Sequence, residues 1–173
     1  MKKDTTIDLT TDVPKPYTLI PTERWTNYDD VPVGFRFGST GKTITEADVY
    51  FGSGAVGGPV HVDLEYIKAN TQFEERLLPG PLILYYGICL ISSTGIYTSL
   101  VVSFGSLDKV RAHKPVYHGD TIRAYATVQS KRVTSKPGLG VVIYDVEVYN
   151  QKDNCVMSFE YTLMVRVEAK EAA

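Results

Sequence analysis

The sequence predicts an α+β domain in which an antiparallel sheet curls around one long central helix. The helix is predicted from residues 77–107, which carry no charged side chain and include an apolar run of about ten residues. A run of this length is too short to cross a bilayer, which takes roughly twenty residues, and it suits a helix buried on all sides. The sheet is predicted from four later segments rich in β-branched and aromatic residues. A helix buried on all sides requires a sheet that curls around it.

The central helix is expected to begin at Pro81, with Gly80 at its N-terminal end. A proline in the first turn costs no hydrogen bond, because the first amide hydrogens of a helix have no partner within it. The polar residues 92–95, which end in a glycine, are expected to terminate the helix.

Four long strands are predicted after the helix, with polar turn groups between them. Short connections between consecutive strands predict an antiparallel meander. The expected strands are residues 100–110, 121–133, 140–150 and 155–167.

The length of 173 residues fits one domain of ordinary size. We expect this domain at residues 31–170, preceded by an N-terminal extension at residues 1–30 that is rich in Thr, Asp, Pro and Lys. The extension is expected to lie on the surface, anchored by Tyr17, Ile20 and Trp25.

Between the extension and the central helix we expect a strand at residues 33–45 and two short helices. Thr45 is expected to cap the first helix, at residues 46–53, because its hydroxyl can accept an amide hydrogen. The second is expected at residues 63–70. Residues 52–61 contain four glycines ahead of Pro59. They predict a tight loop where the backbone comes close to another group.

The composition argues against several classes of protein. A formal net charge of −2 gives no reason to expect nucleic acid or an anionic membrane as a partner. The N-terminal residues lack the apolar core of a signal peptide, so we expect a cytoplasmic protein. The two cysteines, Cys89 and Cys155, lack metal-ligand spacing and are expected to be buried, reduced thiols. We therefore expect no metal and no bound cofactor.

Several short motifs follow one another in a fixed order between residues 29 and 167. They are Phe35–Thr43, Ile44–Asp48, Gly58–Asp63, Leu78–Leu82 and Lys114–Ile122. In this order they resemble the MaoC-like dehydratases of the hot-dog superfamily, the group that includes R-specific enoyl-CoA hydratases. The resemblance implies the hot-dog fold and an acyl-CoA or acyl-carrier-protein thioester as substrate in fatty acid metabolism. It also implies a homodimer, or a dimer of dimers, with sites at the interface.

The resemblance carries one departure in the hydratase loop. In the family a catalytic Asp stands five places before the catalytic His, whereas this chain has Val56 before His61. The family's Asn position is Gly58, and the segment after Asp48 is about two residues shorter than usual. The family's second catalytic acid is therefore missing at its expected position. The residues expected to contact the substrate are Val56, Gly57, Gly58, Pro59, Pro79 and Arg111.

Hydration of a 2-enoyl thioester needs a base that activates water, an acid that protonates Cα, and donors that hold the thioester oxygen. His61 is the catalytic candidate for proton transfer, since imidazole gives and takes protons near neutral pH. The alternative is a loop histidine that only bonds the backbone. The resemblance places the oxygen donor at the amide of Gly80, and the unpaired amides and positive dipole end of a helix support that position.

The other candidates have competing structural roles. Asp63 fits the cap of a short helix, and Glu46 and Asp48 fit the first turn of another. Tyrosines beside a packed helix are usually part of the core. The remaining candidates are Tyr50, Tyr85 and Tyr86 as hydrogen-bond donors, His113 and His118 beside turns, and Arg76, Arg111 and Lys114 as partners for the phosphates of coenzyme A.

Three functions stay open from the sequence. The first is an acyl-thioester hydratase or dehydratase that uses His61 and the Gly80 amide. The second is a hot-dog thioesterase, although many of these use a carboxylate on or near the central helix and residues 77–107 contain none. The third is a non-catalytic acyl-thioester binder or assembly subunit, in which Val56 marks a lost acid.

Overall fold

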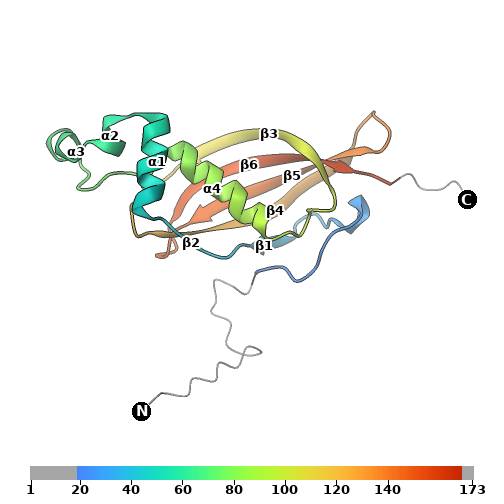
Figure 1. Cartoon of the computed structure of the whole chain (residues 1–173). Helices are drawn as coiled ribbons and strands as arrows, with labels where there is room; N and C mark the ends of the chain where they lie inside the picture. The colour runs from blue at the N-terminus through green and yellow to red at the C-terminus, as the bar shows by residue number, and fades with distance from the viewer. Residues whose placement is uncertain (1–18, 169–173) are drawn as a thin grey trace, which may run out of the picture.

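The computed structural model describes residues 19–168, so the predicted anchor Tyr17 lies outside the described residues. A six-stranded antiparallel sheet packs against helices in an α+β arrangement (Figure 1). The elements are η2 (Tyr28–Asp30), β1 (Arg36–Gly38), β2 (Lys42–Thr43), α1 (Glu46–Val56), α2 (Pro59–Val62), α3 (Leu64–Asn70), α4 (Gly80–Ser93), β3 (Val101–Ala112), β4 (Thr121–Val133), β5 (Leu139–Tyr149) and β6 (Cys155–Arg166).

The sheet has the strand order β1-β4-β5-β6-β3, and β2 also pairs with β4. Strands β4, β5 and β6 form the predicted meander, but the prediction is wrong for β3, which pairs with β6. The prediction assumed short connections between consecutive strands, but residues 113–120 between β3 and β4 form a longer connection than residues 134–138 or 150–154 within the meander. In this connection the carbonyl of Val116 accepts the N–H of Leu78, and Tyr117 forms a bridge with Leu77.

The strand predicted at residues 33–45 is divided into β1 and β2, which both pair with β4. Buried Ser39 lies at the division. Its N–H donates to the carbonyl of Ala124 at 2.9 Å, and its hydroxyl accepts the N–H of Ala124 at 3.0 Å. A side-chain oxygen thus replaces a backbone carbonyl in the ladder, so regular pairing stops there.

The loop predicted at residues 52–61 is mostly helical, which corrects that prediction. Helix α1 continues to Val56, and α2 begins at Pro59. The glycines are tolerated within α1 because one of them makes a close contact. A Cβ at Gly52 would lie 1.8 Å from Cδ1 of Leu82, so α1 packs on α4 at a place where only glycine fits without rearrangement.

One face of α4 completes the core. Ile83, Gly87, Leu90 and Ile91 are buried along it. Gly87 lies so close to the sheet that an added Cβ would be 2.8 Å from Cγ2 of Val148. This face therefore packs directly on the inner side of the sheet, where alternate residues of β4, β5 and β6 are buried.

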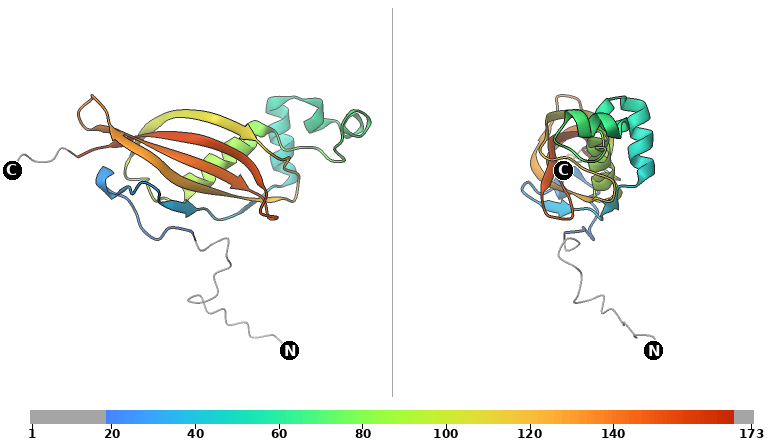
Figure 2. Two further views of the ribbon diagram at one scale, coloured as in Figure 1. Left: turned by 180° about the vertical axis from the view of Figure 1, so that it is seen from behind. Right: turned by 90° about the vertical axis from the view of Figure 1, so that its left-hand side faces the viewer.

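The other face of α4 is open. Tyr85 is 57% exposed and Cys89 is exposed, so the predictions of a helix buried on all sides and of a buried Cys89 thiol are wrong. The physical reason is that the sheet curves along one side of α4 only (Figure 2).

Within residues 19–168, no helix is long and apolar enough to cross a membrane.

Trp25 packs into the core ahead of the first strand. Its side chain is 4% exposed, and its ring centroid lies 5.6 Å from that of Phe35 and 5.8 Å from that of Phe37, edge to face. The backbone N–H of Trp25 donates to the carbonyl of Ile96 at 2.7 Å. Edge-to-face aromatic pairs of this kind stabilise beyond the area they bury, so residues around Trp25 are fastened to the sheet domain.

Candidate active site

His61 lies on the one-turn helix α2 and is fastened to the segment that leads into α4. Its Nδ1 lies 2.9 Å from the carbonyl oxygen of Leu77. Because a carbonyl only accepts, we assign the proton of the neutral ring to Nδ1, and Nε2 is then the basic nitrogen. The N–H of Leu77 donates to the carbonyl of Val60 at 3.2 Å, which adds a second link between the segments.

Gly80 presents a backbone amide at the N-terminus of α4. The amides of Leu82 and Ile83 both donate to the carbonyl of Pro79, and Pro81 has no N–H. The amide of Gly80 has no acceptor among residues 19–168, and an added Cβ would meet nothing within 4 Å. It therefore lies in open space at the positive end of the helix dipole, where a developing negative charge is favoured.

The histidine and this amide belong to one region of the molecule. The carbonyl that accepts from His61 is three residues before Gly80 in the sequence. Three residues span at most roughly 10 Å even when fully extended. The structure therefore brings together the two predicted catalytic groups, which come from separate helices.

The segment that joins α1 to α2 lies beside the histidine. Val56 is the last residue of α1, and Gly57 has a φ of +63°, which favours glycine. Gly58 precedes Pro59 and caps α2, and a Cβ at Gly58 would lie 3.2 Å from Cδ2 of His61. Pro59 is exposed and Pro79, which caps α4, is buried. The loop backbone thus lies against the imidazole, and contact of these residues with substrate stays a prediction.

Arg111 does not join this region. It lies on β3 opposite Ser158 of β6. Ser158 alternates with the buried residues Met157 and Phe159, so it faces away from α4. Arg111 and Ser158 line a polar hollow of about 640 Å³ on this outer face, together with Lys109 and Glu160. Its predicted role as a phosphate contact is therefore not supported by proximity to His61 within this chain.

The acidic residues near the loop are engaged in structural contacts. Asp63 accepts the N–H of Tyr66 at 2.9 Å and caps α3, as predicted. Glu46, in the first turn of α1, forms an ion pair with Arg76. The third candidate, Asp48, is fully engaged as well. All three carboxylates are thus bound to other residues of this chain.

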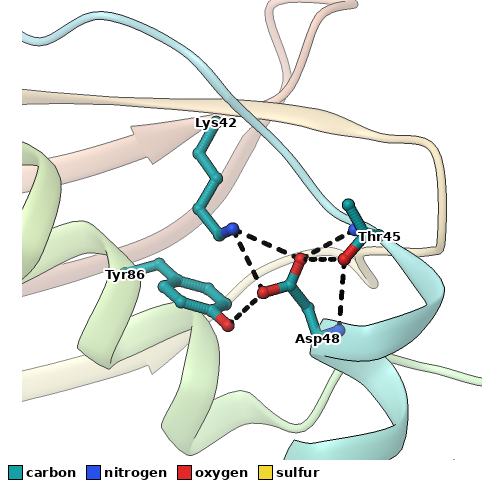
Figure 3. A network of polar contacts seen from close by, with 4 residues as sticks. All are labelled: Lys42, Thr45, Asp48 and Tyr86. Carbon is teal, nitrogen blue, oxygen red and sulfur yellow. Dashed lines mark hydrogen bonds and ion pairs between the residues drawn. The ribbon is translucent and has the colours of Figure 1, made fainter.

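Asp48 lies at the centre of a polar network that joins three elements (Figure 3). One of its oxygens accepts the hydroxyl of Tyr86 at 2.5 Å, and the other accepts the N–H and hydroxyl of Thr45 at 2.8 and 2.7 Å. The Nζ of Lys42 lies 3.1 Å from the first oxygen and 3.2 Å from the second. Burial by itself would raise the pKa of Asp48, but these donors outweigh it and hold the pKa well below its usual range.

The sequence predicted part of this network. Thr45 caps α1 as expected, because its hydroxyl accepts the N–H of Asp48 at 3.3 Å. Tyr86 was a candidate hydrogen-bond donor, but its partner was not predicted, because Tyr86 and Asp48 are 38 positions apart. The role of Lys42 was not predicted. The signal that was present is the three-residue spacing of Thr45 and Asp48, which is typical of a reciprocal cap.

The remaining candidates lie apart from the His61 region or on the surface. His113 is exposed, and its Nε2 lies 2.8 Å from the hydroxyl of Ser158. His118 lines a small hollow with the acidic residues Glu74 and Glu75. Tyr50 is 68% exposed, so it is not part of the core. Among the residues that the structure describes, no group of three or more His, Cys, Asp or Glu side chains is suited to a metal ion.

No protein-family model and no curated protein matches this chain. Several solved structures are similar to this chain. A monoamine oxidase regulatory protein from Archaeoglobus is 28% identical, covering 83% of this chain and 95% of its own, with a TM-score of 0.77. An unliganded R-hydratase from Pseudomonas aeruginosa is 24% identical, covering 86% and 92%, with a TM-score of 0.64. A MaoC-like dehydratase from Rhodospirillum rubrum is 18% identical, covering 83% and 99%, with a TM-score of 0.72.

The two structures below 25% identity share the fold with this chain, and both are hydratases or dehydratases. A further similar structure, from Mycobacterium tuberculosis, is described as a double hot-dog fold. The curved antiparallel sheet and the single long helix fit that description. The observed sheet and helix and the likeness to these structures therefore confirm the predicted hot-dog fold.

Proposed function

We propose that this protein is an acyl-thioester hydratase or dehydratase that adds water to a 2-enoyl thioester or removes it from a 3-hydroxyacyl thioester. The observation that carries the proposal is the pairing of His61 with the α4 N-terminus. The imidazole is oriented through the carbonyl of Leu77, and the amide of Gly80 faces open space nearby. The hydratases and dehydratases among the similar structures support the same reaction class.

In the proposed hydration, Nε2 of His61 takes a proton from water while the water oxygen attacks Cβ. The electrons of the double bond move toward the thioester carbonyl, and the Gly80 N–H holds the negative oxygen. The protonated ring then returns its proton to Cα, so the addition needs no second acid. A positioned acid–base group contributes about 10²–10⁴-fold to such a reaction, and one oxyanion donor about 10²–10³-fold.

An apolar hollow of about 470 Å³ supports an acyl group as part of the substrate. Its lining includes the exposed aromatics Tyr50 and Phe51 together with Val62, which is next to His61 in the sequence. Pockets of this size and character hold small ligands in many proteins. We propose acyl-CoA as the substrate, with acyl-carrier-protein thioesters as the alternative form.

A second copy of the chain is proposed to cover the open side of α4. Strand β3 is an edge strand whose residues are nearly all exposed. On β3, Phe104 is 57% exposed and Val102 is 54% exposed. On α4, Tyr85 is 57% exposed. Exposed apolar groups beside an unpaired strand edge are typical of an association surface. A homodimer is the simplest assembly that would cover them.

The alternative function is a thioester-binding protein without turnover. It is favoured by the absence of the family's acid at position 56 and by the engagement of Asp48 and Asp63 elsewhere. The thioesterase alternative is weaker, because α4 and its flanks carry no carboxylate.

The test is to incubate the purified protein with a series of short and medium 2-enoyl-CoAs and to follow loss of the conjugated thioester, with a thiol reagent in parallel. Saturable hydration that falls at least roughly a hundredfold in His61→Ala is expected. His118→Ala, an exposed histidine on a turn, is the matched control and should keep its activity. Free thiol release would indicate a thioesterase, and binding without turnover would indicate the binder. Hydration that survives in His61→Ala would contradict the proposed mechanism.

The lost acid can be tested by restoring it. Val56→Asp should raise the hydration rate if the site is otherwise intact, because the family's second acid then stands at its expected position. A variant that becomes active from an inactive parent would favour the binder as the natural role of this chain.

A further inference from the structure

Two contacts place α1 on α4 in a single register. The hydroxyl of Tyr86 donates to Asp48, and one turn further along α1 the backbone of Gly52 lies against Leu82. The step from 48 to 52 on α1 is matched by the step from 86 to 82 on α4. The helices therefore run in opposite directions and remain in step over one turn, and Figure 1 shows α1 beside the N-terminal part of α4.

The first of these contacts is reinforced from the sheet. Lys42 of β2 bonds both oxygens of Asp48, and its Nζ lies 4.7 Å from the centroid of the Tyr86 ring. Burial raises the pKa of Tyr86, and the hydrogen bond to the Asp48 carboxylate raises it further, so the phenol stays protonated as a donor. One carboxylate thus ties α1 to both β2 and α4 (Figure 3).

The C-terminal end of α1 reaches the histidine. After Val56 only Gly57 and Gly58 separate α1 from α2. The N–H of His61 donates to the carbonyl of Gly58 at 2.9 Å, while its ring is held by Leu77 on the α4 side. His61 is therefore linked through Gly58 to the connection that follows α1, and through Leu77 to the segment before α4, so a shift of α1 along α4 would move the connection that carries it.

We propose that Tyr86, Asp48 and Gly52 are positioning residues, which set the register of α1 on α4 and thereby hold His61 opposite the Gly80 amide. The proposal rests on the proposed function for its kinetic consequences, but its structural content concerns only this chain. None of the three residues is proposed to touch substrate. Their effect on catalysis passes through the placement of His61.

The decisive variants are Tyr86→Phe, which removes one hydroxyl, and Asp48→Asn, which keeps the shape of the side chain. Tyr85→Phe is the matched control, because Tyr85 lies beside Tyr86 on the same helix but on its open face. Amide hydrogen exchange reports how readily the loop opens, and therefore how firmly its neighbours hold it. Exchange at residues 57–62 should rise on the order of tenfold in Tyr86→Phe and Asp48→Asn, with exchange in β5 unchanged. A general loss of stability would raise exchange in β5 as well.

The imidazole signals of His61 in NMR spectra give a second readout. They should shift in Tyr86→Phe and stay unchanged in Tyr85→Phe. In the active enzyme, kcat should fall on the order of tenfold while KM changes less than about twofold, since misplacement of a catalytic group acts on the chemical step. Gly52→Ala should behave in the same way and be rescued by a second change, Leu82→Ala, which makes room for the new methyl group.

The two proposals fail in different ways. A wild-type protein without hydratase activity would sink the proposed function, yet the exchange and NMR measurements would still decide the positioning role. Wild-type exchange at residues 57–62 and unshifted His61 signals in both Tyr86→Phe and Asp48→Asn would overturn the positioning role, whatever the activity.

Discussion

The two faces of α4 have similar apolar sequences but different surroundings. Ile83, Gly87 and Ile91 are buried against the sheet, whereas Tyr85 and Cys89 on the opposite face are exposed. A run with no charged residue does not by itself distinguish a helix surrounded by its own sheet from one that is covered on one side only. The difference teaches that apolar composition alone does not determine which face of α4 the sheet covers.

The two edges of the sheet show the same contrast. The short strands β1 and β2 share one neighbour, β4, and Phe37 of β1 is fully buried. At the other edge β3 is long and nearly all exposed, with three register shifts against β6. The open face of α4 and the exposed strand β3 both lack cover within the protomer, which supports the proposed homodimer.

The largest expected effect comes from truncating the buried face. Ile91→Ala should lower the free energy of unfolding by roughly 2 to 5 kcal/mol, because it leaves a cavity in a fully buried position. Val133→Ala, at an exposed position at the end of β4, is the control and should change it by less than about 0.5 kcal/mol. Urea denaturation at a fixed protein concentration measures both. Equal losses in the two variants would contradict this prediction.

A change at the open surface should act on association instead. Tyr85→Lys combined with Phe104→Lys should weaken the homodimer by about 2 kcal/mol or more, a factor of roughly 30 in the dissociation constant. Sedimentation velocity over a range of concentrations measures this. Val133→Lys, at an exposed valine near the end of β4, should leave the dissociation constant unchanged. A wild-type chain that sediments as a monomer at all concentrations would contradict the proposed dimer.

The smallest expected effect concerns a hydroxyl in the core beneath the buried face. Tyr144 is fully buried, and its hydroxyl has no hydrogen-bond partner among the described residues. Tyr144→Phe should therefore be neutral or stabilise the protein by up to about 1 kcal/mol. Tyr97→Phe is the comparison, because the Tyr97 hydroxyl lies 3.1 Å from that of Ser92 and its loss should destabilise by about 1 kcal/mol. Thermal unfolding that ranks the two variants in the opposite order would be the contrary result.

Much of the fold could be predicted from the sequence because it depends on local patterns. The period-2 segments gave β4, β5 and β6 to within one residue at each end. Thr45 caps α1 and Asp63 caps α3 because a cap needs only neighbouring residues. The motif order predicted a MaoC-like fold, and the pairing of His61 with the Gly80 region followed from it.

Only the tertiary structure decided the rest, since it depends on contacts between distant residues. The place of β3 beside β6 is a pairing of two strands that β4 and β5 separate in the sequence, which no local pattern reveals. The bond between Tyr86 and Asp48 joins residues 38 positions apart, so the tyrosine reads as core in the sequence. The sequence by itself determined α4 and the strands β4, β5 and β6, and it predicted the two groups of the candidate site. The tertiary structure determined which face of α4 stays open and how α1 is held beside His61, because packing geometry decides both.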